Sequence, residues 1–150
     1  MKAKGVVLRV EYRKFGNQYV VQISKGEELV EKLTEFVEKE NIKLASVSGI
    51  GAVDDIKIGI YDTVNKKYDS LVYKGDYEIS ALVGNISSMK GKPYLHLHIT
   101  IGNVMENKFY CGHLNYGVIS ATSEIFITAI DGEVDRDFNE DIGLNLIKFN

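Results

Sequence analysis

The chain of 150 residues is 45% hydrophobic and contains one proline, which suits one domain with a substantial core. Its apolar runs are far shorter than the roughly 20 residues that cross a bilayer, so no membrane span is expected. A net charge of -3 gives no support to general binding of a phosphate backbone, and a single cysteine excludes an internal disulfide. We expect one domain over residues 1–150, located in the cytoplasm because residues 1–5 show no secretory or transit pattern.

The first part of the chain predicts a hairpin followed by a helix. Residues 6–10 and 19–23 have the composition of strands, and a Gly-Asn pair between them predicts a turn. Ser24, followed three residues later by Glu27, matches a capping box, after which apolar residues recur at helical spacing. The pattern predicts one amphipathic helix over about residues 25–40.

The rest of the chain predicts mostly strands. Strand-forming residues fill the segments 44–48, 56–61, 71–73, 77–83, 94–101, 109–113, 118–120 and 125–129. One main helix among this many strands predicts the α+β class. Gly49 and Gly51 are interpreted as turn glycines. The acidic segment 131–137 is interpreted as a solvated loop, because a calcium-binding EF-hand would require glycine in place of Arg136.

The three histidines are predicted to converge. His96 and His98 lie two residues apart in a predicted strand, so their imidazoles project from one face. A polar turn at residues 105–106 folds residues 109–113 back on this strand and places His113 opposite His98. Three neutral imidazoles with an open position suit zinc or a similar divalent ion. Alternatively, they are polar members of a half-buried sheet face.

Three other residues are candidates for this site. The same register puts Cys111 opposite Thr100 on the histidine face, although a slip of one residue would reverse its direction. Glu124 or Glu78 is the candidate general base, should a metal-bound water attack an ester, amide or phosphate. Glu124 could instead orient an imidazole or lie on the surface. An enzymatic role therefore stays open at this point.

Four segments form a specific set when taken in order. They are Gly-Asp-Tyr-Glu-Ile-Ser-Ala-Leu-Val-Gly-Asn-Ile-Ser at 75–87, Gly-Lys-Pro-Tyr-Leu-His-Leu-His at 91–98, Cys-Gly-His-Leu at 111–114 and Ala-Thr-Ser-Glu-Ile at 121–125. The set resembles the plant-and-prokaryote-conserved (PPC) domain, a module that follows AT-hooks in plant nuclear proteins and occurs alone in bacteria and archaea. The resemblance covers essentially the whole chain.

This resemblance implies an α+β fold with a strongly bent antiparallel sheet, one packed helix and assembly into a homotrimer. It also implies that His96, His98 and His113 bind a metal, with zinc as the expected ion. Stand-alone members are commonly described as candidate DNA-binding proteins, a description inherited from the AT-hook relatives. This chain has no AT-hook, and Asp76 replaces the arginine of the plant segment that contacts partner proteins. Cys111 replaces a glycine.

Three functions remain in competition. The first is a metal-binding homotrimer with a DNA-associated or regulatory role, for which basic residues near the N-terminus would cluster on one surface. Those residues are Lys2, Lys4, Arg9, Arg13 and Lys14, and they also fit a solvated strand face. The second function is a metal-dependent hydrolase. The third is a sensor that binds a small anionic ligand at the open metal position.

Overall fold

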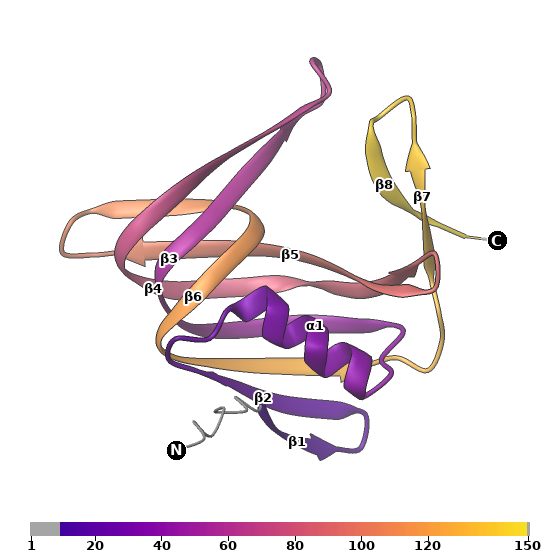
Figure 1. Cartoon of the computed structure of the whole chain (residues 1–150), viewed down its shortest axis with the longest axis horizontal. Helices are drawn as coiled ribbons and strands as arrows, with labels where there is room; N and C mark the ends of the chain where they lie inside the picture. Colours follow the sequence, from indigo (N-terminus) through magenta and orange to yellow (C-terminus); the bar gives the residue numbers. More distant parts are fainter. Residues whose placement is uncertain (1–9, 150) are drawn as a thin grey trace, which may run out of the picture.

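The computed structural model describes residues 10–149, which form a six-stranded antiparallel sheet, one helix and a two-stranded C-terminal hairpin (Figure 1). The elements in chain order are β1 (Glu11–Phe15), β2 (Gln18–Ser24), α1 (Leu29–Lys39), β3 (Ala45–Asp62), β4 (Lys67–Met89), β5 (Lys92–Asn103), β6 (Lys108–Ala129), β7 (Asp135–Asn139) and β8 (Leu144–Lys148). This is the predicted α+β class. The predicted strand at residues 6–10 lies almost entirely outside the described residues.

The order of the large sheet is β1-β2-β6-β3-β4-β5, and β6 pairs with β5 as well. Strands β3, β4, β5 and β6 therefore form a closed ring of pairings. β6 makes this possible because its first part lies beside β5 and its last part lies beside β2. The histidines lie where β5 pairs with the start of β6.

Helix α1 covers one face of the sheet (Figure 1). Leu29, Leu33, Phe36 and Val37 are buried against the sheet core. The Phe36 ring makes edge contacts with Tyr12 and Tyr19 at centroid distances of 4.9 and 5.3 Å. Complete burial of side chains of this size stabilises the fold by about 1.5–3 kcal/mol each. Helix α1 has neither the length nor the apolar character needed to cross a membrane.

The helix begins four residues later than predicted. The Glu27 carboxylate does accept a hydrogen bond from the Ser24 amide, which is one half of the predicted capping box. The N-cap is nevertheless Glu28, whose side chain accepts hydrogen bonds from the amides of Val30 and Glu31. The sequence pattern thus identified the turn at Ser24 and Glu27 that leads into the helix. The predicted helix start was wrong because it fell inside this turn.

The strands are longer than predicted, because several predicted breaks are bulges within continuous strands. Gly49 and Gly51 lie inside β3 and flank a shift in its register with β4. The interpretation of both as turn glycines was wrong. A Cβ atom at Gly51 would lie 2.5 Å from the Thr122 carbonyl oxygen, so glycine permits the close approach of β6.

The acidic segment was also predicted incorrectly in part. Residues 135–139 form β7, which pairs with β8 at residues 144–148. In β7 the buried Arg136 alternates with the exposed Asp135 and Asp137, so a charged side chain occupies the inward position. Arg136 is 5% exposed, so its side chain is buried where a solvated loop was expected.

Candidate metal centre

Two histidines of β5 point to the same face of the sheet because the residues that alternate with them face the core. Leu97 and Ile99 are each 2% exposed, and they alternate with His96 and His98. Burial of the two aliphatic side chains fixes which face the imidazoles occupy, since a slip of one residue would expose both. The alternation of the sequence thus determines the direction of two of the three candidate ligands.

The turn between β5 and β6 brings in the third histidine. The Asn103 side-chain oxygen accepts hydrogen bonds from the amides of Met105 and Glu106, which closes the turn. The register that follows pairs His98 directly with His113. This pairing confirms the predicted turn and the predicted register.

The three imidazoles form a compact triangle. Their ring centroids are 5.1 Å apart for His96 and His98, 5.4 Å for His96 and His113, and 5.6 Å for His98 and His113. One nitrogen from each ring lies within 4.8 Å of the other two. Nitrogen atoms about 2.1 Å from a tetrahedral ion would be about 3.4 Å apart, a separation that small rotations of these rings can reach. The donor set therefore fits a divalent transition metal with an open position.

The surroundings of two of these rings favour their neutral form. Burial lowers the pKa of His96 below its ordinary 6.5, and nearby positive groups, His113 first, lower it further. Burial, followed by the charge of His98, lowers the pKa of His113 as well. Neutral imidazoles are the form that binds a metal, so both lowered pKa values favour metal binding.

The lowered pKa values predict that the metal-free protein loses stability in mild acid. The unfolded chain binds more protons than the folded chain at pH values between the folded-state pKa values and 6.5, so stability rises with pH in that window. Each such histidine changes the free energy of unfolding by at most about 1.4 kcal/mol per pH unit. Urea unfolding of metal-free protein at about pH 5.5 and pH 7.5 measures the difference. The variant His96→Gln/His113→Gln should show a smaller pH dependence, and an equal one would contradict the prediction.

The other candidate residues do not meet the triad. Cys111 pairs with Thr100 as predicted, yet the histidines cluster without it and its side chain is exposed. Glu78 pairs with Gly102, four positions along β5 from His98, or about 13 Å. Glu124 lies eleven positions along β6 from His113 and pairs with Ile50 of β3. Glu78 and Glu124 instead line one shallow pocket on the sheet face.

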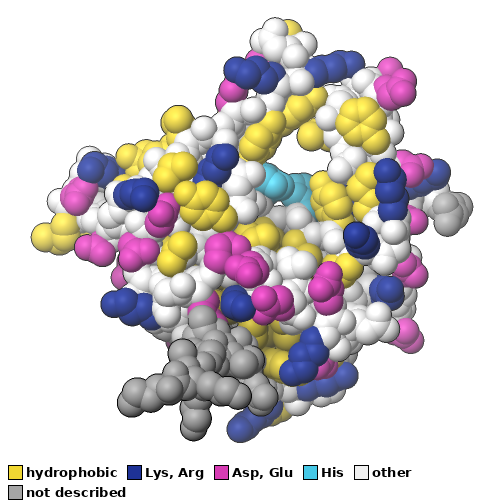
Figure 2. Space-filling model, viewed as in Figure 1, with side chains coloured by type: hydrophobic (Ala, Val, Ile, Leu, Met, Phe, Trp, Pro, Cys, Tyr) yellow, Lys and Arg dark blue, Asp and Glu magenta, His cyan; other side chains and the backbone are white. Residues whose placement is uncertain are grey.

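The triad lies at the floor of a hollow. Figure 2 shows histidine side chains below the tip of the β3–β4 hairpin, with apolar side chains on both sides. The two hairpin tips meet across this hollow: the Tyr61 hydroxyl donates to the Ile142 carbonyl at 2.8 Å, and the Lys66 ammonium donates to the Glu140 carbonyl at 2.8 Å. Access to the histidine triad from this side is therefore limited by both hairpins.

Two neighbours of the triad were not predicted from the sequence. The Tyr68 ring lies edge-on to His113 at 5.9 Å, and its hydroxyl donates to Asn115 at 2.7 Å. Arg136 is the second neighbour, and its charge acts on His96. No local signal in the sequence links Arg136 to residues some 50 positions earlier.

An α+β fold with three histidines on adjoining strands of its sheet defines the class of protein. The family model of the Plants and Prokaryotes Conserved (PCC) domain matches residues 10–131. The chain therefore belongs to this family, which is the PPC family predicted from the sequence motifs. Comparison with curated proteins gave no match.

Solved structures with the same fold extend the comparison. A protein of Bacteroides thetaiotaomicron, described as a candidate DNA-binding protein, has a TM-score of 0.90 at 35% identity, covering 93% of this chain and 97% of its own. A protein of Archaeoglobus fulgidus described as metal-containing has a TM-score of 0.83 at 33% identity, covering 95% and 99%. A plant- and prokaryote-conserved protein of Pyrococcus horikoshii has a TM-score of 0.80 at 31% identity, covering 97% and 98%.

Proposed function

We propose that this protein is a homotrimeric regulatory protein in which His96, His98 and His113 bind one divalent metal ion, with zinc as the expected ion. The observation that carries the proposal is the convergence of one nitrogen from each histidine to within 4.8 Å of the others. The description of the A. fulgidus relative as metal-containing supports it. The open position would bind water or a ligand, and the ion would supply a Lewis acid there.

Elemental analysis tests this proposal. Purified, untagged protein is compared with the His96→Ala/His98→Ala variant after both are loaded with zinc and passed through a desalting column. We expect about one zinc per chain in the wild type and none in the variant. A wild type without metal after reconstitution would make the histidines structural and would refute the proposed centre.

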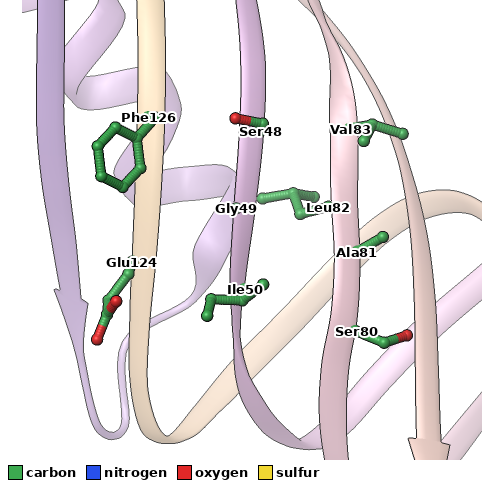
Figure 3. A pocket seen from close by; sticks show the side chains of 9 residues that line it. All are labelled: Ser48, Gly49, Ile50, Ser80, Ala81, Leu82, Val83, Glu124 and Phe126. Atoms are coloured by element: carbon green, nitrogen blue, oxygen red, sulfur yellow. The ribbon is translucent and has the colours of Figure 1, made fainter.

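The homotrimer is proposed from the family resemblance and from an apolar area on the sheet face. Figure 3 shows the shallow pocket there, where Ile50, Val83 and Phe126 lie among serines and Glu124. These three side chains are 55%, 51% and 52% exposed, which is unusual for large apolar groups so close together. Val83 pairs with His98, so the proposed interface borders the metal centre.

Introducing a charge into this apolar area is expected to dissociate the trimer. The change Phe126→Lys would bury an unpaired ammonium in the interface, which costs several kcal/mol. Mass by light scattering should fall from three chains to one. The control Val104→Lys changes an equally apolar residue that is 78% exposed at the β5–β6 turn, and it should leave the mass unchanged. A monomeric wild type would rule out the homotrimer.

A DNA-associated role is the part of the proposal that comes from the relatives. The net charge of -3 gives no support to direct binding, and of the five basic residues near the N-terminus only Arg13 and Lys14 lie in the described chain. Both belong to β1, and the Lys14 ammonium lies 5.2 Å from the ring centre of Tyr19 on β2. Retention on duplex DNA at about 50 mM salt, lost as the salt is raised, would support direct binding.

A further inference from the structure

The C-terminal hairpin places a buried cation beside the histidine triad. The guanidinium carbon of Arg136 lies 4.6 Å from the Tyr94 ring centre. Its Nε donates to the Ser87 hydroxyl at 2.7 Å, and its Nη2 donates to the Asn85 side-chain oxygen at 3.0 Å. Asn85 pairs with His96, and Tyr94 precedes His96 by two residues on the same face of β5. The guanidinium is therefore held at the His96 side of the triad.

This cation has no anionic partner among residues 10–149. Its acceptors are the Ser87 hydroxyl, the Asn85 amide and the Asn145 carbonyl, all neutral. The ion pairs of the described chain all use lysine. Burial of a charge is costly unless it is paired, and Arg136 is only 5% exposed. Three of its five N–H groups have acceptors, which leaves two for a further acceptor.

The site as a whole lacks negative charge. Within the described residues, the histidine cluster includes no carboxylate. Three neutral imidazoles would leave the two charges of a divalent ion uncompensated, and Arg136 adds a further positive charge close enough to act on His96. Burial lowers the pKa of Arg136, as expected for a guanidinium without an anionic partner.

We propose that Arg136 makes the histidine site specific for an oxyanion, namely a carboxylate or phosphate group held by the metal and by the guanidinium together. Arginine suits this role because its fork of donors matches the oxygen atoms of both groups. Arg136 lies outside residues 10–131, the part that matches the family model, so the specificity comes from the C-terminal hairpin of this chain. The metal contact rests on the proposed function, whereas the guanidinium contact needs no metal.

Anion titrations of the wild type and three variants test the proposal. Arg136→Gln removes the charge, Ser87→Ala weakens the attachment of the hairpin and keeps the charge, and Lys148→Gln removes an exposed charge from the same hairpin. Acetate and inorganic phosphate are titrated separately into cobalt-loaded protein while the visible spectrum is recorded. The same anions are added to metal-free protein, and the shift in melting temperature is measured against chloride of equal ionic strength.

We expect Arg136→Gln to weaken anion binding by roughly tenfold to a hundredfold at unchanged metal content, as for a lost hydrogen bond between charged groups. Lys148→Gln should keep the affinity of the wild type within about twofold, and Ser87→Ala, which removes one guanidinium acceptor and keeps the charge, should lose less affinity than Arg136→Gln. The titrations with acetate and phosphate show which oxyanion is preferred. Equal affinity in Arg136→Gln, or an equal loss in Ser87→Ala, would overturn the proposal and make Arg136 a tether of the hairpin only.

The metal-free measurement separates the two proposals. A wild type that binds no cobalt or zinc refutes the proposed function, yet an anion-dependent melting shift that disappears in Arg136→Gln would still support the guanidinium contact. Should Arg136→Gln fail to fold, the wild type and Ser87→Ala decide the matter. Absence of an anion-dependent shift in the wild type would overturn the proposal, as would a shift that is lost completely in Ser87→Ala, and a shift that persists in Ser87→Ala would support it.

Discussion

Replacing Gly84 with alanine is expected to destabilise the protein by about 3 kcal/mol or more and to displace the histidine strand. A Cβ atom at this position would lie 2.0 Å from the His96 carbonyl oxygen and 2.9 Å from the Leu97 Cα atom. Both are main-chain atoms of β5, which cannot move aside as the end of a flexible side chain can. Relief of the contact requires β5 to move away from β4, and His96 and His98 move with it.

Urea unfolding with and without zinc measures both parts of this prediction. Gly117→Ala is the matched control, because a Cβ atom there would lie 3.5 Å from its nearest neighbour, Val53, at ordinary contact distance. We expect Gly84→Ala to lower the midpoint and to weaken zinc binding, and Gly117→Ala to change neither appreciably. Equal stability of the two variants would show that β4 and β5 are less closely packed than the structure indicates.

Zinc is expected to stabilise the wild type by about 4 kcal/mol when its free concentration is roughly a thousand times the dissociation constant. The reason is that the unfolded chain does not hold three imidazoles within reach of one ion, so zinc binds preferentially to the folded state. Thermal unfolding in buffered zinc, followed by addition of a chelator, measures the gain and its reversal. The expected gain in His98→Ala is close to zero.

Cys111→Ser provides the control for this experiment. Its thiol is exposed and lies outside the histidine cluster, so the variant should retain the full stabilisation by zinc. Loss of the stabilisation in Cys111→Ser would make the thiol a fourth ligand. A gain that persists in His98→Ala would instead place zinc at another site.

The candidate ligands could be predicted from the sequence because their geometry is local. The alternation around Leu97 fixes the direction of His96 and His98, and a short turn fixes the register of His113. A hairpin of this kind depends on residues close together in the chain. The class of fold could be predicted for the same reason, since each strand and the helix carry their own periodicity.

The rest depends on contacts between distant parts of the chain. The continuity of β3 through Gly49 and Gly51 requires β6 to approach closely, and no property of residues 45–62 alone reveals that. Arg136 acquires its environment from Ser87 and Asn85, which precede it by 49 and 51 residues. A charged residue between aspartates is typical of a surface loop, and only the packing of the hairpin on β4 makes it a buried cation.

The meeting of the two hairpin tips above the histidines has a consequence for how relatives could diverge. The ligands lie on β5 and β6, whereas the rim of the hollow consists of Tyr61 and Lys66 on one side and residues 140–142 on the other. Hairpin tips tolerate insertions and exchanges far better than paired strands. Changes in tip length would therefore alter the size of molecule that reaches the histidines without disturbing the strands that carry them, so that access to the triad and its geometry can evolve independently.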